Sequence, residues 1–249
     1  MYTAMAMGMS RERVKVVLFQ LREDDEVKTI DRDSYLRALR LAPAQLVTFD
    51  VMASAPDASI LAGANAVIVG GSKWSVWEDV PNQPSLIEVL KAARAKKIPI
   101  IGICFGAQLL AHAFGGKVVR DEEHAEWGTY DVTTSDDSFT DLLFADAPFS
   151  FPAQCAHHDK IVTPPTGAVV LASSDHCAIQ AFAVPGADIY GLQFHPERNK
   201  ADYEHLLQMR GRDYSADQSN IEKIRASLKE TPEAEKVLEK FMDRIVLQR

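Results

Sequence analysis

Cysteine is scarce in this sequence, with Cys104, Cys155 and Cys177 the three examples in 249 residues. An odd number at wide spacing, without a Cys-x-x-Cys pair, argues against both a disulfide framework and a zinc site. Such cysteine usage suits a reducing compartment, so we expect a cytoplasmic protein. We expect neither a bound metal nor another cofactor.

Long apolar runs and basic runs are missing as well. No stretch approaches the roughly 20 apolar residues that a membrane-spanning helix needs. Residues 1–12 are rich in Met and Ala at their start and lack the pattern of a signal peptide, so we interpret them as a flexible N-terminal extension. The net charge is −8, and no basic cluster suggests nucleic acid or a membrane surface as a partner. A small-molecule substrate is the partner that we expect.

The chain is 47% hydrophobic and 25% charged, which allows a sizeable core. Apolar strand-like runs at Val14–Phe19, Gln45–Asp50 and Asn65–Val69 are separated by helical patterns, of which Gln83–Lys97 is the clearest. Strands alternating with helices indicate an α/β fold whose mostly parallel sheet is covered on both faces.

The charged segment Arg22–Asp31 predicts a surface loop, and Asp33 or Ser34 then caps a helix that ends near Leu41. Phe139–Phe144 predicts a short helix. Four further strand patterns follow at short intervals, which indicates antiparallel additions to the sheet: Phe149–His157, Val169–Ser173, Ala178–Val184 and Ile189–Phe194. We expect one domain over residues 13–200 and a helical C-terminal appendage over residues 201–249.

Ile98–Leu110 reads as a strand, a cysteine between two glycines, and a helix. A chain that passes from strand to helix within one residue makes a sharp corner, and Gly102 and Gly106 remove side chains that would clash there. We expect the sulfur of Cys104 to be exposed at the sheet edge beside a helix N-terminus. The helix dipole would then lower the thiol pKa from about 8.5 and favour a nucleophilic thiolate.

A thiolate nucleophile needs a proton shuttle and a group that orients it. His195 ends an apolar strand, so it should reach the same sheet edge as Cys104. Glu197 follows two positions later, where an extended chain places its carboxylate on the same side as the imidazole. We therefore predict that Cys104, His195 and Glu197 act together in catalysis.

A glycine pair, Gly70 and Gly71, directly follows the predicted strand Asn65–Val69. Glycine pairs in this position can expose backbone N–H groups to an anion. A plain turn is the better explanation for the pair in isolation, but its position at the same end of the sheet as Cys104 favours the functional role. Trp74 and Trp77 come next, and they could line the mouth of a pocket or simply cover the sheet.

The stretches 102–108 (GICFGAQ) and 191–197 (GLQFHPE) together resemble the class I glutamine amidotransferases. The resemblance covers roughly residues 14–198 and implies a flavodoxin-like sheet with a Cys-His-Glu triad. It implies that Cys104 attacks the side-chain amide of glutamine to form a γ-glutamyl thioester. It also implies an oxyanion hole of the Phe105 and Gly71 backbone N–H groups, and substrate contacts from Gln108 and Gly70.

Residues 156–162 (AHHDKIV) resemble a segment of the amidotransferase domains of GMP synthases. By this resemblance His157 forms a wall of the glutamine pocket, while an ordinary loop position for it stays open. Ala107 stands where these relatives often carry histidine, a departure that leaves the triad untouched but puts the pocket shape in doubt.

Glutamine amidotransferases supply ammonia to a synthase, yet the sequence contains no phosphate-binding loop of an ATP-dependent synthetase. Three functions remain open. The first is hydrolysis of glutamine, with a synthase as a separate partner subunit. The second is hydrolysis of other γ-glutamyl amides by the same thioester chemistry. The third is a catalytically silent binding or regulatory module.

Overall fold

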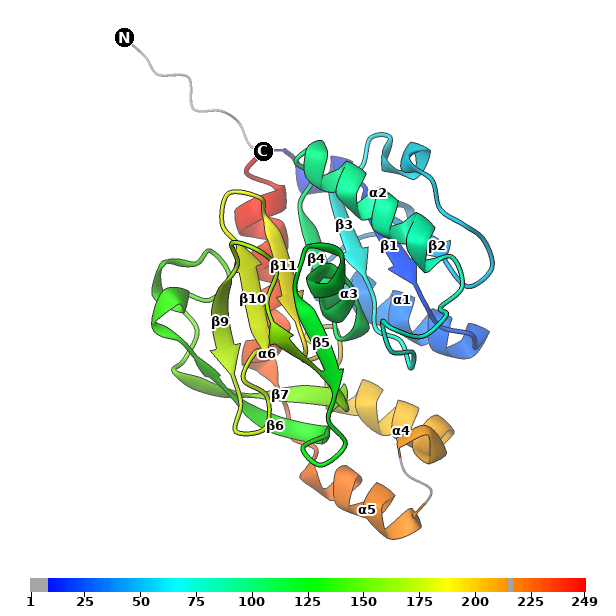
Figure 1. Ribbon diagram of the computed structural model, residues 1–249, viewed down its shortest axis with the longest axis vertical. Coiled ribbons are helices and arrows are strands. Elements are labelled where there is room, and N and C mark those ends of the chain that lie inside the picture. The colour runs from blue at the N-terminus through cyan, green and yellow to red at the C-terminus, as the bar shows by residue number, and fades with distance from the viewer. Residues whose placement is uncertain (1–8, 215–216) are drawn as a thin grey trace.

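The computed structural model describes residues 9–214 and 217–249. Its centre is a nine-stranded sheet of order β2-β1-β3-β4-β11-β10-β9-β6-β7 (Figure 1). A separate two-stranded sheet pairs β5 with β8. The strands are β1 (Val16–Gln20), β2 (Leu46–Asp50), β3 (Ala66–Val69), β4 (Ile100–Ile103), β5 (Lys117–Arg120), β6 (Glu126–Thr134), β7 (Ser150–His157), β8 (Asp159–Thr163), β9 (Val169–Ser173), β10 (Ala181–Val184) and β11 (Ile189–Leu192).

The sheet has a parallel part and an antiparallel part. Strands β2, β1, β3, β4 and β11 run parallel to one another, and β10, β9, β6 and β7 continue from β11 as antiparallel neighbours. Parallel strands place their carboxyl ends at one edge, so β1, β3, β4 and β11 deliver their following loops to the same side. This architecture confirms the predicted flavodoxin-like α/β fold with added antiparallel strands.

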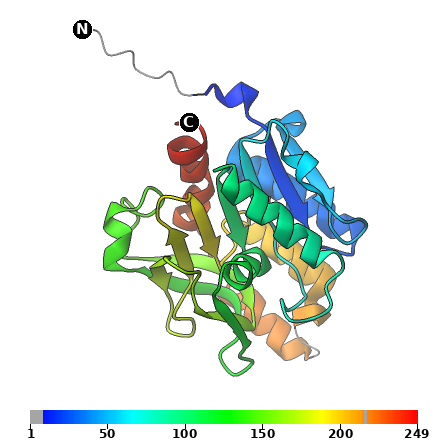
Figure 2. The same ribbon diagram turned by 45° about the horizontal axis from the view of Figure 1, so that its top comes forward.

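Helices cover both faces of the parallel part (Figures 1 and 2). The side chains of β1 alternate, so that Val16 and Leu18 pack on one face while Val17 and Phe19 pack on the other. The first face carries α1 (Asp25–Leu39) and α6 (Pro232–Phe241), and the second carries α2 (Gln83–Ala95) and α3 (Phe105–Ala113).

The segment after residue 200 is helical, as expected, but its helices differ in where they pack. Helices α4 (Lys200–Tyr214) and α5 (Gln218–Ser227) contact each other beyond the end of the sheet and share a small apolar cluster. Helix α6 and the π-helical turn Met242–Val246 instead bury an apolar stripe in the main core. The predicted domain limits at residues 13 and 200 stay predictions, and residues 1–8 of the predicted extension lie outside the described residues.

Three local predictions are wrong. Neither Asp33 nor Ser34 caps a helix, because both lie inside α1. Most of the segment Arg22–Asp31 is not a loop, because α1 already begins at Asp25, with the Asp24 carboxylate accepting hydrogen bonds from the N–H groups of Glu26 and Val27. The predicted helix Phe139–Phe144 is a 3₁₀ turn at Asp136–Thr140. In the described parts of the chain, no helix is long and apolar enough to cross a membrane.

Candidate active site

Cys104 occupies the corner between β4 and α3 with φ 53° and ψ −109°, a backbone conformation that residues other than glycine rarely adopt. The flanking glycines make the corner possible. A Cβ atom on Gly102 would lie under 3 Å from the Gly106 backbone, and one on Gly106 would lie under 3 Å from the carbonyl of Val69. The glycine-cysteine-glycine pattern therefore reports close packing of α3 onto β4 and β3.

The sulfur of Cys104 is buried, with 4% of the residue exposed, so the prediction of an exposed sulfur is wrong. Its Sγ donates to the Ala156 carbonyl over 3.7 Å. Burial raises the pKa of the thiol to about 11, although the positive charge of Arg22 and the Phe105 N–H both act to lower it. The predicted low pKa is therefore wrong too, because desolvation outweighs the start of the helix.

His195 reaches the same edge because β11 lies beside β4, with Leu192 paired to Ile103. Its Nδ1 lies 2.7 Å from Oε1 of Glu197, and both side chains are almost fully buried. Burial lowers the pKa of His195, and the Glu197 carboxylate only partly offsets this. Among the described residues Nε2 has no partner, so a neutral imidazole presents an unoccupied nitrogen.

Behind Glu197 lies a buried chain of charges that the sequence did not predict. Arg198 Nε is 3.4 Å from Glu197 Oε1, and Arg198 Nη2 donates to Asp31 Oδ1 at 2.7 Å. The other oxygen of Asp31 accepts from Arg22 Nε at 2.8 Å. Burial alone would raise the pKa of Asp31, but the two guanidinium groups outweigh it and hold that pKa below its ordinary value. Asp31 is therefore a carboxylate shared by two arginines.

The two glycines after β3, Gly70 and Gly71, have different surroundings. The N–H of Gly70 donates to the Phe19 carbonyl at 3.0 Å, so it belongs to the sheet. Gly71 lies directly against the reacting groups, because a Cβ there would be 2.9 Å from Arg22 Nη2 and 3.1 Å from His195 Cε1. The oxyanion roles of Gly71 and Phe105 and the substrate contact of Gly70 stay predictions.

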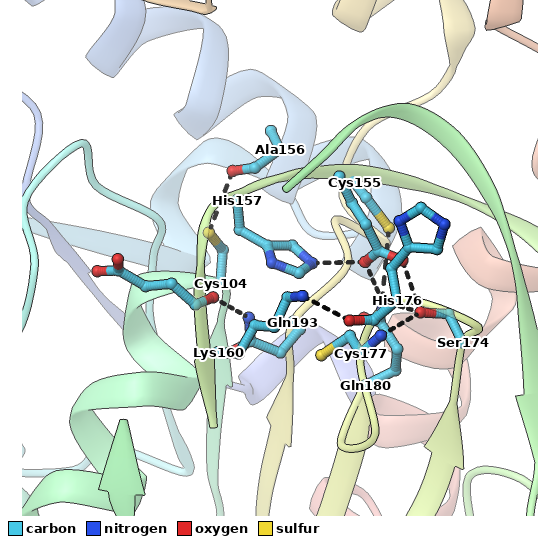
Figure 3. A network of polar contacts seen from close by, with 12 residues as sticks. Cys104, Cys155, Ala156, His157, Lys160, Ser174, His176, Cys177, Gln180 and Gln193 are labelled. Carbon is cyan, nitrogen blue, oxygen red and sulfur yellow. Dashed lines mark hydrogen bonds and ion pairs between the residues drawn. The ribbon is translucent and has the colours of Figure 1, made fainter. Parts of the chain in front are cut away.

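A second polar network lies beside Cys104, at the start of β6 and the end of β7 (Figure 3). His157 Nε2 lies 2.9 Å from Glu126 Oε2, and both side chains are buried. Glu126 also accepts from Ser174 Oγ at 2.6 Å and from the amide of Gln180. The network fixes the end of β7, whose Ala156 carbonyl faces the Cys104 sulfur.

Glu126, Cys155 and His157 also place three potential metal-ligand atoms within 4.8 Å of one another. Both oxygens of Glu126 already have protein partners, and burial raises the pKa of the Cys155 thiol well above its ordinary value. A metal would need that thiol deprotonated. The described residues therefore explain this group as a hydrogen-bonded core network.

A cavity of about 1050 Å³, counting its open mouth, connects the predicted residues. Cys104, His195, Gln108 and His157 all line it, and the Gln108 side-chain amide donates to the Asp159 carbonyl at 3.1 Å. Of its outer wall, only Trp74 was anticipated from the sequence, as one of two possible roles, while Trp77 is 48% exposed and does not line the cavity. That wall contains Arg22, Glu23, Asp24, Lys73, Trp74, Trp127, Leu206 and Arg210.

The family description "Glutamine amidotransferase class-I" matches residues 33–210, which include the Cys104 corner and the His195 turn. The chain belongs to this family. It is 34% identical over 148 residues to one of the subunits of the glutamine-hydrolyzing GMP synthase of Picrophilus torridus, covering 59% of this chain and 74% of that protein.

Two further likenesses define how far the similarity extends. The chain is 34% identical over 139 residues to the GMP synthase (glutamine-hydrolyzing) of Ligilactobacillus salivarius, covering 55% of this chain and 25% of that protein. A crystal structure of a glutamine amido transferase from Methylobacillus flagellatus superposes with a TM-score of 0.72 at 23% identity, over 96% of each chain. At that identity the likeness shows the fold.

Proposed function

We propose that this amidotransferase hydrolyses the γ-amide of glutamine to glutamate and ammonia. The observation that carries the proposal is the unoccupied Nε2 of a Glu197-bound His195 at the same sheet edge and in the same cavity as Cys104. Membership of the family makes glutamine the first substrate to test.

In the first half of the reaction, His195 Nε2 accepts the thiol proton as Cys104 Sγ bonds to the amide carbon of glutamine. The oxyanion that forms accepts hydrogen bonds from the backbone N–H groups of Phe105 and Gly71. Collapse of this intermediate breaks the C–N bond, and the imidazolium returns its proton to the departing ammonia. The product on the enzyme is a γ-glutamyl thioester.

In the second half, neutral His195 accepts a proton from water, and the resulting hydroxide attacks the thioester carbon. Cleavage of the C–S bond releases glutamate, and the imidazolium reprotonates the sulfur of Cys104. Glu197 holds Nδ1 throughout and stabilises the imidazolium in both halves. The burial of Cys104 suits this scheme, because proton transfer to His195 accompanies attack and no free thiolate is required.

A separate synthase is the acceptor of ammonia that we propose. The relative from Picrophilus torridus is named as one of the subunits of a glutamine-hydrolyzing GMP synthase. In the relative from Ligilactobacillus salivarius the matched part is 25% of one longer chain. Both observations support a part that works beside a second catalytic unit.

Hydrolysis of larger γ-glutamyl amides is the second candidate, favoured by the residues that line the cavity. Its wall extends to Leu206 and Arg210 on α4 and to Trp127 on β6, well beyond the Cys104 corner. A leaving group larger than ammonia would contact these residues. A silent binding module is disfavoured, because all three groups needed for thioester chemistry are present.

Ammonia release from glutamine and glutamate release from a γ-glutamyl dipeptide, measured side by side, separate the two reactions. We expect Cys104→Ala to abolish both activities, because it removes the nucleophile. Cys177→Ala is the matched control, since this cysteine is equally buried but does not line the cavity. Full activity in Cys104→Ala, with mass spectrometry excluding wild-type protein, would refute the mechanism.

A further inference from the structure

In the part of the chain that the structure describes, four lysine and arginine side chains line the cavity, and each of them has a carboxylate partner. Lys73 Nζ lies 2.5 Å from Glu23 Oε2, and Arg210 Nη1 lies 2.7 Å from Asp24 Oδ2. Arg198 is buried between Asp31 and Glu197. The fourth cation, Arg22, is the one whose position and partners need an explanation.

Arg22 is anchored at one edge and open at the other. Its Nε donates to Asp31 at 2.8 Å, while the described residues provide no hydrogen-bond partner for Nη1 and Nη2. Asp31 is 3% exposed and holds Arg198 with its other oxygen. Asp31 thus occupies only the Nε edge of Arg22, and the two Nη groups of this cavity-lining residue keep their donors available.

The open edge of Arg22 lies close to the reacting groups. Its Nη2 and the Cε1 of His195 both come within about 3 Å of the point that a Gly71 Cβ would occupy. In an extended glutamine the α-carboxylate is four bonds from the amide carbon, a span of about 5 Å because each ~1.5 Å bond of a zigzag chain advances about 1.25 Å. A carboxylate at that distance from the site of attack is within reach of this guanidinium.

We propose that Arg22 binds the α-carboxylate of the γ-glutamyl group, with Asp31 as the residue that positions it. A guanidinium whose Nε is occupied still offers two parallel N–H donors, the geometry that fits a carboxylate. The substrate class follows: γ-amides whose acyl part carries a free carboxylate at the far end. The inference rests on the proposed function, and Arg22 and Asp31 both precede residue 33, where the family match begins.

Three amides test the proposal: glutamine, glutaramate, which lacks the α-amino group, and 4-aminobutanamide, which lacks the α-carboxylate. For Arg22→Met we expect kcat/KM to fall about 10–100-fold with glutamine and glutaramate, the loss typical of a charge-assisted hydrogen-bonded pair. The fall should be mainly in KM. With 4-aminobutanamide the variant and the wild type should agree within about twofold.

Arg22→Lys keeps the charge but not the paired donors, so it should lie between the wild type and Arg22→Met. Lys73→Met is the matched control, because Lys73 lines the same cavity and already has Glu23 as a partner. A loss of equal size with all three amides would overturn the proposal, since it would place the effect on Cys104 or on the fold. An unchanged Arg22→Met enzyme would also overturn it.

A binding measurement keeps the inference separate from the proposed function. If the wild type releases no ammonia from glutamine, the proposed hydrolysis fails, but alkylation of Cys104 by iodoacetamide still reports occupancy of the cavity. We expect glutamate to slow alkylation in the wild type and not in Arg22→Met, and 4-aminobutanoate to slow it in neither. Equal protection by the two compounds, or none by glutamate, would overturn the role of Arg22.

Discussion

At the scale of single residues, the proposed chemistry starts from a cysteine and a histidine that are both neutral at rest. Burial raises the pKa of Cys104 to about 11 and lowers that of His195. A thiolate–imidazolium pair would require the reverse order of pKa values. The nucleophile is therefore made during the reaction, and its formation depends on an unprotonated His195.

The pH dependence of kcat/KM follows from this order. Protonated His195 cannot accept the thiol proton, so activity should be lost as the pH falls through the His195 pKa. Because burial lowers that pKa, we expect the midpoint of the acid limb below 6.5. The measurement is a steady-state profile of ammonia release from about pH 4.5 to about pH 9, a range that brackets the ordinary pKa of histidine.

Alkylation kinetics give an independent check on the same pair. The rate of Cys104 labelling by iodoacetamide should still rise at alkaline pH, since a thiol with a pKa of about 11 is scarcely ionised at neutrality. A labelling plateau that begins below neutral pH would contradict a neutral resting pair.

Gly71 is the backbone position where a single added methyl group should reveal the packing of the site. A Cβ there would crowd Arg22 Nη2 at 2.9 Å and His195 Cε1 at 3.1 Å. We expect Gly71→Ala to reduce kcat about 10-fold or more, since displaced catalytic groups are costly, with little change in the melting temperature. The kinetic constants and a thermal unfolding curve measure the two effects; a variant with wild-type kcat would argue against the proposed contact.

At the scale of elements, the parts that could be predicted are those whose signal is local. The corner at Cys104 was predictable because a glycine stands on each side of it, between a strand pattern and a helix pattern. A Cβ atom at either glycine would collide with the backbone. The start of α1 was not predictable in this way. Asp31 belongs to its buried face, where it is tolerated only because Arg22 and Arg198, from elsewhere in the chain, hold it.

The pairing of β6 with β7 carries the testable prediction at this scale. Glu126 is a buried carboxylate whose pKa falls below its ordinary value: burial would raise it, but His157, Ser174 and Gln180 outweigh that effect. A hydrogen bond to a charged group is typically worth about 1.5–3 kcal/mol, and the Glu126 carboxylate accepts several. We expect Glu126→Gln to lower the free energy of unfolding by roughly 2–4 kcal/mol and to reduce kcat through the displaced end of β7.

Chemical denaturation at several pH values tests this account. A carboxyl group with a lowered pKa in the folded state contributes stability above its unfolded pKa, and that contribution is lost as the pH falls through its folded pKa. The difference between wild type and Glu126→Gln should therefore be present at pH values above the ordinary 4.5 and shrink at lower pH. A difference that stays constant down to the lowest pH would exclude an ionised Glu126 as its source.

At the scale of the whole molecule, the packing of the C-terminal segment is the feature that could least be predicted from the sequence. Its helices were predictable from their spacing, but the spacing does not say what an apolar stripe packs against. Val237, Leu238 and Phe241 on α6 are buried in the same core as β1 and α1, and Phe241 meets the ring of Tyr190 on β11. The long-range contacts of α6 thus complete the cover of one sheet face.

Phe241→Ala tests this completion. Truncating a fully buried phenylalanine leaves a cavity and typically costs about 3–5 kcal/mol. Phe139→Ala is the matched control, since Phe139 is 64% exposed and should change stability by less than about 0.5 kcal/mol. Urea unfolding of both variants provides the comparison, and equal stability of the two would show that α6 does not support the core.

Asp31 gives helix α1 a direct connection to the reacting groups, since its two oxygens hold Arg22 at the cavity and Arg198 beside Glu197. A displacement of α1 would carry both guanidinium groups with it. Any contact that shifts α1 would therefore move the Arg22 and Arg198 side chains together.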